Sequence, residues 1–112
     1  MLHFRAAEEA IHAVESNGLI LGFLPAAVYE SKTLLLGEND RFLLYTDGVL
    51  EASRNGEEFG QARLQELFRV ANTADQICDS VTAAVDHWAS GVASDDITVV
   101  AMQFDSLPAK PK

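Results

Sequence analysis

The sequence predicts a layered α+β domain in which helices cover a sheet. Two segments, 41–46 and 97–104, are rich in β-branched, aromatic and other large apolar residues, which favour strands. Two segments between them carry apolar residues at the spacing of an amphipathic helix. The 112 residues suit a single domain, which we expect to span 1–106, followed by a short tail at 107–112.

The N-terminal segment allows two interpretations. Four apolar residues recur at helical spacing, and the Ala- and Glu-rich composition around them favours a helix: Ala7, Ala10, Ile11 and Val14. Asn17-Gly18 then supplies a turn signal that is compatible with a helix or with a hairpin. Local sequence alone therefore favours the helix.

The middle of the chain is predicted to form a hairpin between Val28 and Thr46. From Val28 to Leu36, small, polar and apolar residues mix at nearly period two, which is typical of a strand with one face in water. The residues at 37–40 then give a turn signal. Four large apolar or aromatic residues follow in succession, and such a run indicates a strand over 41–46 that is buried on both faces.

Two helices are predicted in the second half of the chain, after a short helical turn at Val49–Ser53. The first runs from about Gly60 to Ala71 and carries an apolar stripe. The second begins at Thr73, which forms a capping box with Gln76, and ends near Gly91. The segment 97–104 is then predicted to be a central strand, and the proline- and lysine-containing tail at 107–112 is expected to be disordered.

Charge and cysteine content argue against several classes of function. The chain has 17 acidic and 8 basic side chains, a net charge of −9, and no Lys/Arg cluster, so nucleic acid and anionic membranes would be repelled. Cys78 is the only cysteine, which leaves no intrachain disulfide, and its helical position favours a small buried hydrophobe over a reactive thiol. Without a long apolar run or a secretory signal pattern, a cytoplasmic protein is expected.

Two acidic turns at strand ends are the candidate metal site. Tyr45-Thr46-Asp47-Gly48 follows one predicted strand, and Ser94-Asp95-Asp96-Ile97-Thr98 precedes another. Carboxylates there are rigidly held yet open to water, as Mg²⁺ or Mn²⁺ requires. If the two strands pair, Asp47 and Asp95 come to one edge of the sheet, and a divalent cation removes their repulsion. The alternative is that Asp-Gly is a common hairpin turn and that adjacent aspartates only solvate a loop.

Three motifs, in this order, resemble the C-terminal half of the SpoIIE-type serine phosphatases, bacterial relatives of protein phosphatase 2C. They lie at Leu43–Ala52, Asn55–Gly60 and Ser94–Val100. The resemblance implies part of an α/β-β/α sandwich, with a mostly antiparallel sheet covered by two helices. It also implies an N-terminal hairpin with strands at Leu2–Arg5 and Ile11–Ser16, and we follow the hairpin in preference to the helix.

The resemblance implies that Asp47 and Asp95 are metal ligands, in a site that holds two Mn²⁺ or Mg²⁺ ions in the complete domain. The ions activate a water for attack on a phosphoserine. Gly48 would leave room beside the ion. Asp96 is given a supporting role rather than that of a ligand, because relatives in the wider group often carry Asn at this position. Leu50 departs from the commonest family pattern, which has Thr.

The implied function is the C-terminal portion of a metal-dependent protein serine/threonine phosphatase in bacterial signalling. Its implied substrate is a phosphorylated regulatory protein such as an anti-sigma-factor antagonist. The family's earlier Asp-Gly segment has no counterpart before Asp47, so the chain alone is expected to be weak or inactive. The alternative is a non-catalytic or truncated phosphatase-like module for protein interaction. A homodimer, or association through an exposed sheet edge, is also expected.

Overall fold

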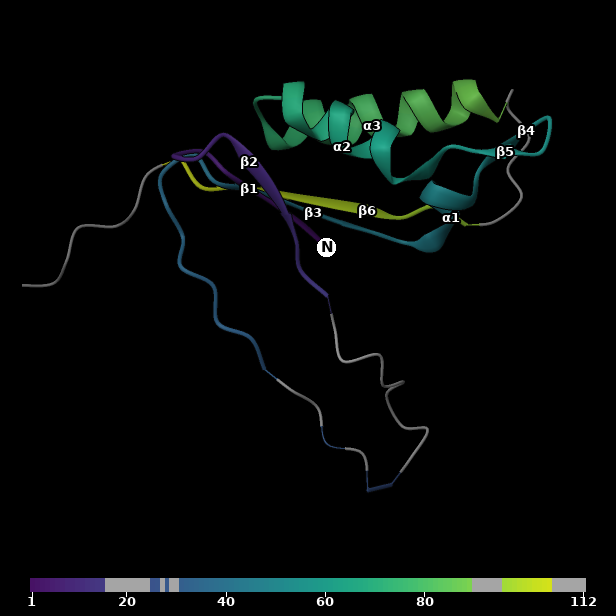
Figure 1. Ribbon diagram of the computed structural model, residues 1–112. Coiled ribbons are helices and arrows are strands. Elements are labelled where there is room, and N and C mark those ends of the chain that lie inside the picture. Colours follow the sequence, from purple (N-terminus) through teal and green to yellow (C-terminus); the bar gives the residue numbers. More distant parts are fainter. Residues whose placement is uncertain (16–24, 27, 29–30, 90–95, 106–112) are drawn as a thin grey trace, which may run out of the picture.

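The computed structural model describes residues 1–15, 25–26, 28, 31–89 and 96–105. Its main sheet has four strands in the order β2-β1-β3-β6, and every neighbouring pair is antiparallel (Figure 1). The strands are β1 (Leu2–Arg5), β2 (Ala10–Ala13), β3 (Arg41–Tyr45) and β6 (Val99–Gln103). The remaining elements are α1 (Asp47–Glu51), the two-stranded hairpin β4 (Ser53–Arg54) and β5 (Glu57–Glu58), α2 (Gly60–Val70) and α3 (Ala74–Trp88). The predicted α+β class is confirmed.

The helices α2 and α3 cover one face of the sheet and build the core with it (Figure 1). Leu2 of β1 and Leu43 of β3 lie side by side in register and are fully buried. The helices contribute further fully buried residues to the same cluster: Leu64, Phe68, Ile77, Val81 and Val85. The apolar stripes of the two helices are therefore the core stripes that their spacing predicts.

The N-terminal segment forms the hairpin rather than the helix that its local spacing favours. In β1–β2, Leu2 lies opposite Ala13 and Arg5 opposite Ala10. β1 also pairs with β3, and this second pairing places Leu2 and Phe4 in the core. Helix propensity is a weak preference that tertiary packing overrides, and the burial of β1 between two strands supplies that packing.

The hairpin predicted between Val28 and Thr46 is wrong. Residues 28 and 31–37 form no strand, while 27, 29 and 30 lie outside the described residues. Both sides of β3 are already paired, one with β1 and the other with β6, so no edge of β3 is left for the preceding segment. Leu44 is 37% exposed, so β3 is not buried on both faces, and β6 forms an edge of the described sheet rather than its centre.

The second predicted helix begins as its capping box indicates. The side chain of Thr73 accepts a hydrogen bond from the amide of Gln76 at 3.1 Å. The side chain of Gln76 reaches back and accepts from the amide of Asn72 at 2.9 Å. Cys78 of α3 is half-buried. The predicted end at Gly91 and the predicted tail lie outside the described residues. Within the described ranges, no helix is long and apolar enough to cross a bilayer.

Candidate functional site

Thr46 connects the turn after β3 to the turn before β6 through hydrogen bonds. Its amide donates to the carbonyl of Thr98 at 3.1 Å, and its hydroxyl accepts from the amide of Thr98 at 3.1 Å. The same hydroxyl donates to the carbonyl of Asp96 at 3.3 Å. The predicted pairing of the strand ending at Thr46 with the strand starting near Ile97 is therefore confirmed, with Tyr45 opposite Val99.

Asp47 lies at the point where β3 gives way to α1. It is the first residue of that helix, and its side chain is exposed, whereas Gly48 and Val49 are buried. The amide of Val49 donates to the carbonyl of Thr46 at 3.1 Å, which closes the turn behind Asp47. Because Val49 is fully buried in the core, α1 holds the carboxylate of Asp47 on a fixed backbone that is open to water.

The negative charge of Asp47 affects the pKa of its neighbour Tyr45. Burial raises the pKa of the half-buried Tyr45 hydroxyl, and the negative charges of Asp47 and Glu15 raise it further. A cation bound at Asp47 would oppose this effect, since it would offset the negative charge of the carboxylate. The phenol of Tyr45 is thus a reporter of charge at this end of the sheet.

The oxygen atoms at this end of the sheet are of the type that a hard cation binds, but those in the described residues are too few to complete its coordination. Mg²⁺ and Mn²⁺ prefer carboxylate and carbonyl oxygens and seek about six of them. The exposed Asp47 carboxylate is such a donor, and Asp96, also exposed, adjoins it through the contacts of Thr46. Asp95 lies outside the described residues. In the part of the chain that the structure describes, no three His, Cys, Asp or Glu side chains are grouped closely enough to hold a metal ion.

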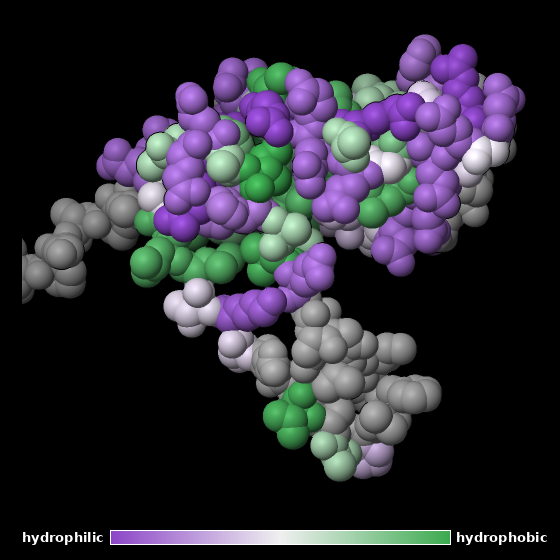
Figure 2. Space-filling model, viewed as in Figure 1, coloured by the Kyte–Doolittle hydropathy of each residue, from purple (hydrophilic) through white to green (hydrophobic). Residues whose placement is uncertain are grey.

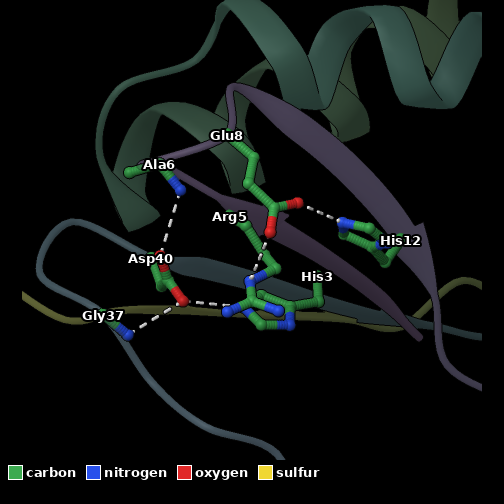
Figure 3. Close-up of polar contacts among 7 residues, drawn as sticks. All are labelled: His3, Arg5, Ala6, Glu8, His12, Gly37 and Asp40. Carbon is green, nitrogen blue, oxygen red and sulfur yellow. Dashed lines mark hydrogen bonds and ion pairs between the residues drawn. The ribbon is translucent and has the colours of Figure 1, made fainter.

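A second polar cluster lies at the other end of β3, around the buried Asp40 (Figure 3). One carboxylate oxygen accepts from the amide of Ala6 at 3.0 Å. The other lies 2.8 Å from His3 Nε2 and accepts from the amide of Gly37 at 3.0 Å. Burial raises the pKa of Asp40, but the hydrogen bonds from Gly37, His3 and Ala6 outweigh that effect and lower the pKa overall. This cluster ties β1 to the start of β3.

Sequence reasoning assigned no role to Thr46 or to Asp40. Both act through partners distant in sequence, Thr46 over 50 and 52 residues and Asp40 over 34 and 37. The one local signal for Thr46 is its place between a predicted strand and an Asp-Gly turn, where a side-chain hydroxyl can cap the strand end. For Asp40 the local signal is the turn 37–40, in which an Asp side chain accepts from a nearby backbone amide.

Comparison with known proteins places the chain in a family. A family model described as Stage II sporulation protein E (SpoIIE) matches residues 1–105. Protein IcfG of Synechocystis sp. is 30% identical to the chain over 94 residues, which cover 81% of the chain and 15% of IcfG.

Solved structures show the same fold. The phosphatase domain of the cell-fate determinant SpoIIE from Bacillus subtilis superimposes with a TM-score of 0.69 at 20% identity, over 97% of this chain and 49% of that one. A Mn-presoaked structure of the same domain gives a TM-score of 0.69 at 22% identity, over 97% and 48%. The SiaA-PP2C domain of Pseudomonas aeruginosa gives 0.59 at 24% identity, over 71% and 35%.

The chain thus spans about half of the solved SpoIIE phosphatase domain and a small part of IcfG. Its antiparallel sheet, covered on one face by helices, agrees with the fold of that domain. Together with the match of the family model over nearly all residues, this shows that the chain belongs to the SpoIIE family and has the fold of a phosphatase-2C-like domain.

Proposed function

We propose that this chain contributes half of the metal site of a protein serine/threonine phosphatase, with Asp47 and Asp95 as ligands of Mn²⁺ or Mg²⁺. The observation that supports the proposal most is the double link between Thr46 and Thr98, which brings the end of β3 to the turn that precedes β6. Asp47 follows Thr46 in the sequence, and Asp95 precedes Thr98 by three residues. Membership of the SpoIIE family adds independent support.

The residues of the chain have separate roles in this proposal. Asp47 supplies an anionic oxygen on a backbone that α1 and Val49 hold in place. Gly48 is buried directly after Asp47 and brings no side chain to this position. Asp96 supports the turn through its carbonyl, which accepts from Thr46. When bound, the metal would activate a water for attack on phosphorus and offset charge on the transferring phosphoryl group.

The proposed substrate is a phosphoserine or phosphothreonine on a regulatory protein, such as an anti-sigma-factor antagonist in cytoplasmic signalling. Family membership supports this class of substrate, and the net charge of −9 disfavours nucleic acid as the partner. The chain spans 49% of the solved SpoIIE domain, and two aspartates are few for ions that seek about six oxygens each. We therefore propose that the chain alone binds metal weakly and turns over substrate slowly or not at all.

Calorimetric titration of Mn²⁺ into the chain tests the metal site. The wild type is expected to bind saturably, and Asp47→Ala and Asp95→Ala are each expected to weaken binding by about tenfold or more, because each removes a charged ligand. Asp86→Ala is the matched control, since Asp86 is an exposed aspartate on α3. Absence of binding in the wild type, or equal binding in all three variants, would contradict the proposed ligands.

A phosphatase assay separates the enzyme from the alternative, a non-catalytic interaction module. The module is the alternative because the chain spans 49% of the solved SpoIIE domain. The assay compares release of phosphate from a phosphoserine protein by the chain with and without Mn²⁺. Slow, Mn²⁺-dependent release that is lost in Asp47→Ala supports the enzyme and contradicts the module.

A further inference from the structure

The hairpin β4–β5 connects α1 to α2, and its six residues, 53–58, are all exposed and either polar or glycine. In Figure 1 the hairpin lies beside α1 and the end of α3, and Figure 2 shows mostly hydrophilic surface at this end of the molecule. A two-stranded hairpin by itself is at best marginally stable in water. Its position therefore depends on contacts with residues outside it.

Trp88, the last residue of α3, makes one of these contacts. Its indole N–H donates to the carbonyl of Glu57 at 3.1 Å, which joins the end of α3 to β5. Its ring also meets the ring of Phe59 edge to face, with 6.2 Å between the ring centres. Because Phe59 is buried and Trp88 packs against the core, these contacts attach the end of the hairpin to the core.

Arg63 of α2 makes the other contacts. Its guanidinium lies 4.0 Å from the ring centre of Trp88. Nη1 donates to the carbonyls of Glu58 at 3.2 Å and Phe59 at 2.9 Å, and Nη2 donates to the Glu57 carboxylate at 2.9 Å. The ion pair with Glu57 is exposed and contributes little. The stacking and the charge-assisted bonds to the two carbonyls are therefore the contacts that hold the end of β5.

One further hydrogen bond connects this region to α1. The amide of Phe59 donates at 2.7 Å to the carbonyl of Ala52, the buried residue at which α1 ends. Asp47 begins the same helix, which has only five residues. A helix this short is not stable by itself, so its direction depends on what holds it. Val49 anchors it in the core, and the bond between Ala52 and Phe59 holds its end.

The other proposed ligand is near the same contacts in the sequence. Trp88 ends α3, and Asp95 follows it by seven residues. The chain segments that bear Asp47 and Asp95 are thus each linked, within a few residues, to the place where Trp88 meets Phe59.

We propose that Arg63 and Trp88 are positioning residues for Asp47. By holding the end of β5 against the end of α3, they fix the end of α1 and, with it, the turn that carries the Asp47 carboxylate. Neither residue contacts the metal in this scheme, because both act through Phe59 and Ala52. The inference rests on the proposed function, since the site that the pair serves is the proposed metal site.

Hydrogen exchange of the metal-free chain tests whether the pair holds α1. Arg63→Lys keeps the charge but loses the planar group that stacks and donates at the same time. We expect exchange to be about threefold faster or more at the amide of Val49, which donates to the carbonyl of Thr46 in the first turn of α1. Arg69→Lys is the matched control, because Arg69 lies on the same helix and forms an exposed ion pair with Glu66.

Calorimetric titration of Mn²⁺ into the same variants tests the effect on the metal site. Arg63→Lys is expected to weaken Mn²⁺ binding by about threefold or more, whereas Arg69→Lys is expected to leave it unchanged. Because both substitutions conserve charge, a difference between them does not arise from net electrostatics. Trp88→Phe is a second variant that removes the indole donor and keeps an aromatic ring, and it is expected to act in the same direction.

Three results would overturn the inference. Faster exchange at Phe59 with none at Val49 would mean that the pair holds the hairpin alone. Equal acceleration at Val49 and at Ile77, whose amide donates to Thr73 in α3, would indicate a general loss of stability. Unchanged Mn²⁺ affinity in both Arg63→Lys and Trp88→Phe would exclude a role in the site.

Failure of the proposed function gives a different result. Absence of Mn²⁺ binding in the wild type contradicts the proposed metal site, and exchange at Val49 then still supports or overturns the positioning of α1 by the pair. Circular dichroism checks that the variants fold. Should Arg63→Lys unfold, Trp88→Phe takes its place in both measurements.

Discussion

Thr46 and Thr98 are joined by two hydrogen bonds of 3.1 Å, in which each amide donates to the other residue. The amide of Thr46 reaches the carbonyl of Thr98, but the amide of Thr98 reaches the hydroxyl of Thr46 rather than its carbonyl. The carbonyl of Thr46 is thereby left to accept from the amide of Val49, and this hydrogen bond forms the first turn of α1. A side-chain oxygen thus lets the chain change from strand to helix at Asp47 without breaking its link to β6.

Thr46→Val is expected to weaken Mn²⁺ binding by about tenfold or more while lowering the free energy of unfolding by only about 1 kcal/mol. Valine keeps the shape of threonine but leaves the Thr98 amide without its acceptor and frees the turn at Asp96. Calorimetry and urea unfolding measure the two effects. Thr82→Val on α3 is the matched control, since in the described part of the chain its hydroxyl bonds within its own helix, to the carbonyls of Cys78 and Asp79. Unchanged Mn²⁺ affinity in Thr46→Val would show that this link does not organise the site.

Asp40→Ala is expected to lower the free energy of unfolding at pH 7 by about 3 kcal/mol. The buried carboxylate serves Ala6, Gly37 and His3 at once, so its removal leaves several polar groups without a partner. Urea unfolding followed by circular dichroism measures the loss. A loss below about 0.5 kcal/mol would mean that water replaces the carboxylate at little cost.

The contribution of Asp40 is also expected to depend on pH. Folding lowers the pKa of this carboxyl, so its stabilising effect is fully present above the pKa of the unfolded chain, about 3.9. The effect is lost as the pH falls through the lower pKa of the folded state. The difference in unfolding free energy between wild type and Asp40→Ala should therefore shrink as the pH falls below about 4. A difference that does not shrink there would contradict the lowered pKa.

Gly56→Ala is expected to destabilise the β4–β5 hairpin by about 1 kcal/mol through backbone strain alone. Gly56 has φ +83°, and an added Cβ would meet nothing within 4 Å, so crowding does not contribute. Gly37→Ala is the matched control, because its Cβ would make only ordinary contact with Asp40 at 3.4 Å or more and its φ is not positive. Hydrogen exchange at the amide of Phe59, which donates to Ala52 at 2.7 Å beside the hairpin, reports the local opening. Equal exchange in both variants would contradict the role of φ.

Local pattern predicted the helices of this fold better than its strands. The stripes and the capping box of α2 and α3 depend on residues three and four apart, which interact within the helix itself. The hairpin β1–β2 and the absence of a strand at 31–37 depend instead on which segments pair with β3, and β3 has room for only two neighbours. The resemblance to a family, rather than periodicity, identified β1 and β2.

The sequence predicted that Asp47 lies at the end of a strand, but not the contacts that hold it there. The Asp-Gly turn after an apolar strand indicates this position in the local sequence, and the role of Asp47 as a metal ligand stays a prediction. Thr46 was part of the same motif, yet its bonds to Asp96 and Thr98 depend on the pairing of β3 with β6 across some 50 residues. Sequence patterns report such bonds only when the pairing itself is known.

Arg41→Met is expected to raise the free energy of unfolding by about 1 kcal/mol, although it removes a charge. Arg41 is 7% exposed, and among the described residues its Nε atom is buried without a hydrogen-bond partner. Burial lowers the pKa of Arg41, which reflects the same cost of removing the cation from water. Its guanidinium lies 4.0 Å from the ring centre of Phe4, a contact that offsets part of this cost.

Methionine would keep the packing of the Arg41 stem on Phe4 and remove the unsatisfied donor, so the balance favours the variant. Arg41→Ala is the control for packing, and it is expected to lower the free energy of unfolding because it removes the stem as well as the charge. Urea unfolding of the three proteins at pH 7 decides the matter. A loss in Arg41→Met as large as that in Arg41→Ala would show that the cation–ring contact outweighs the cost of burying the charge.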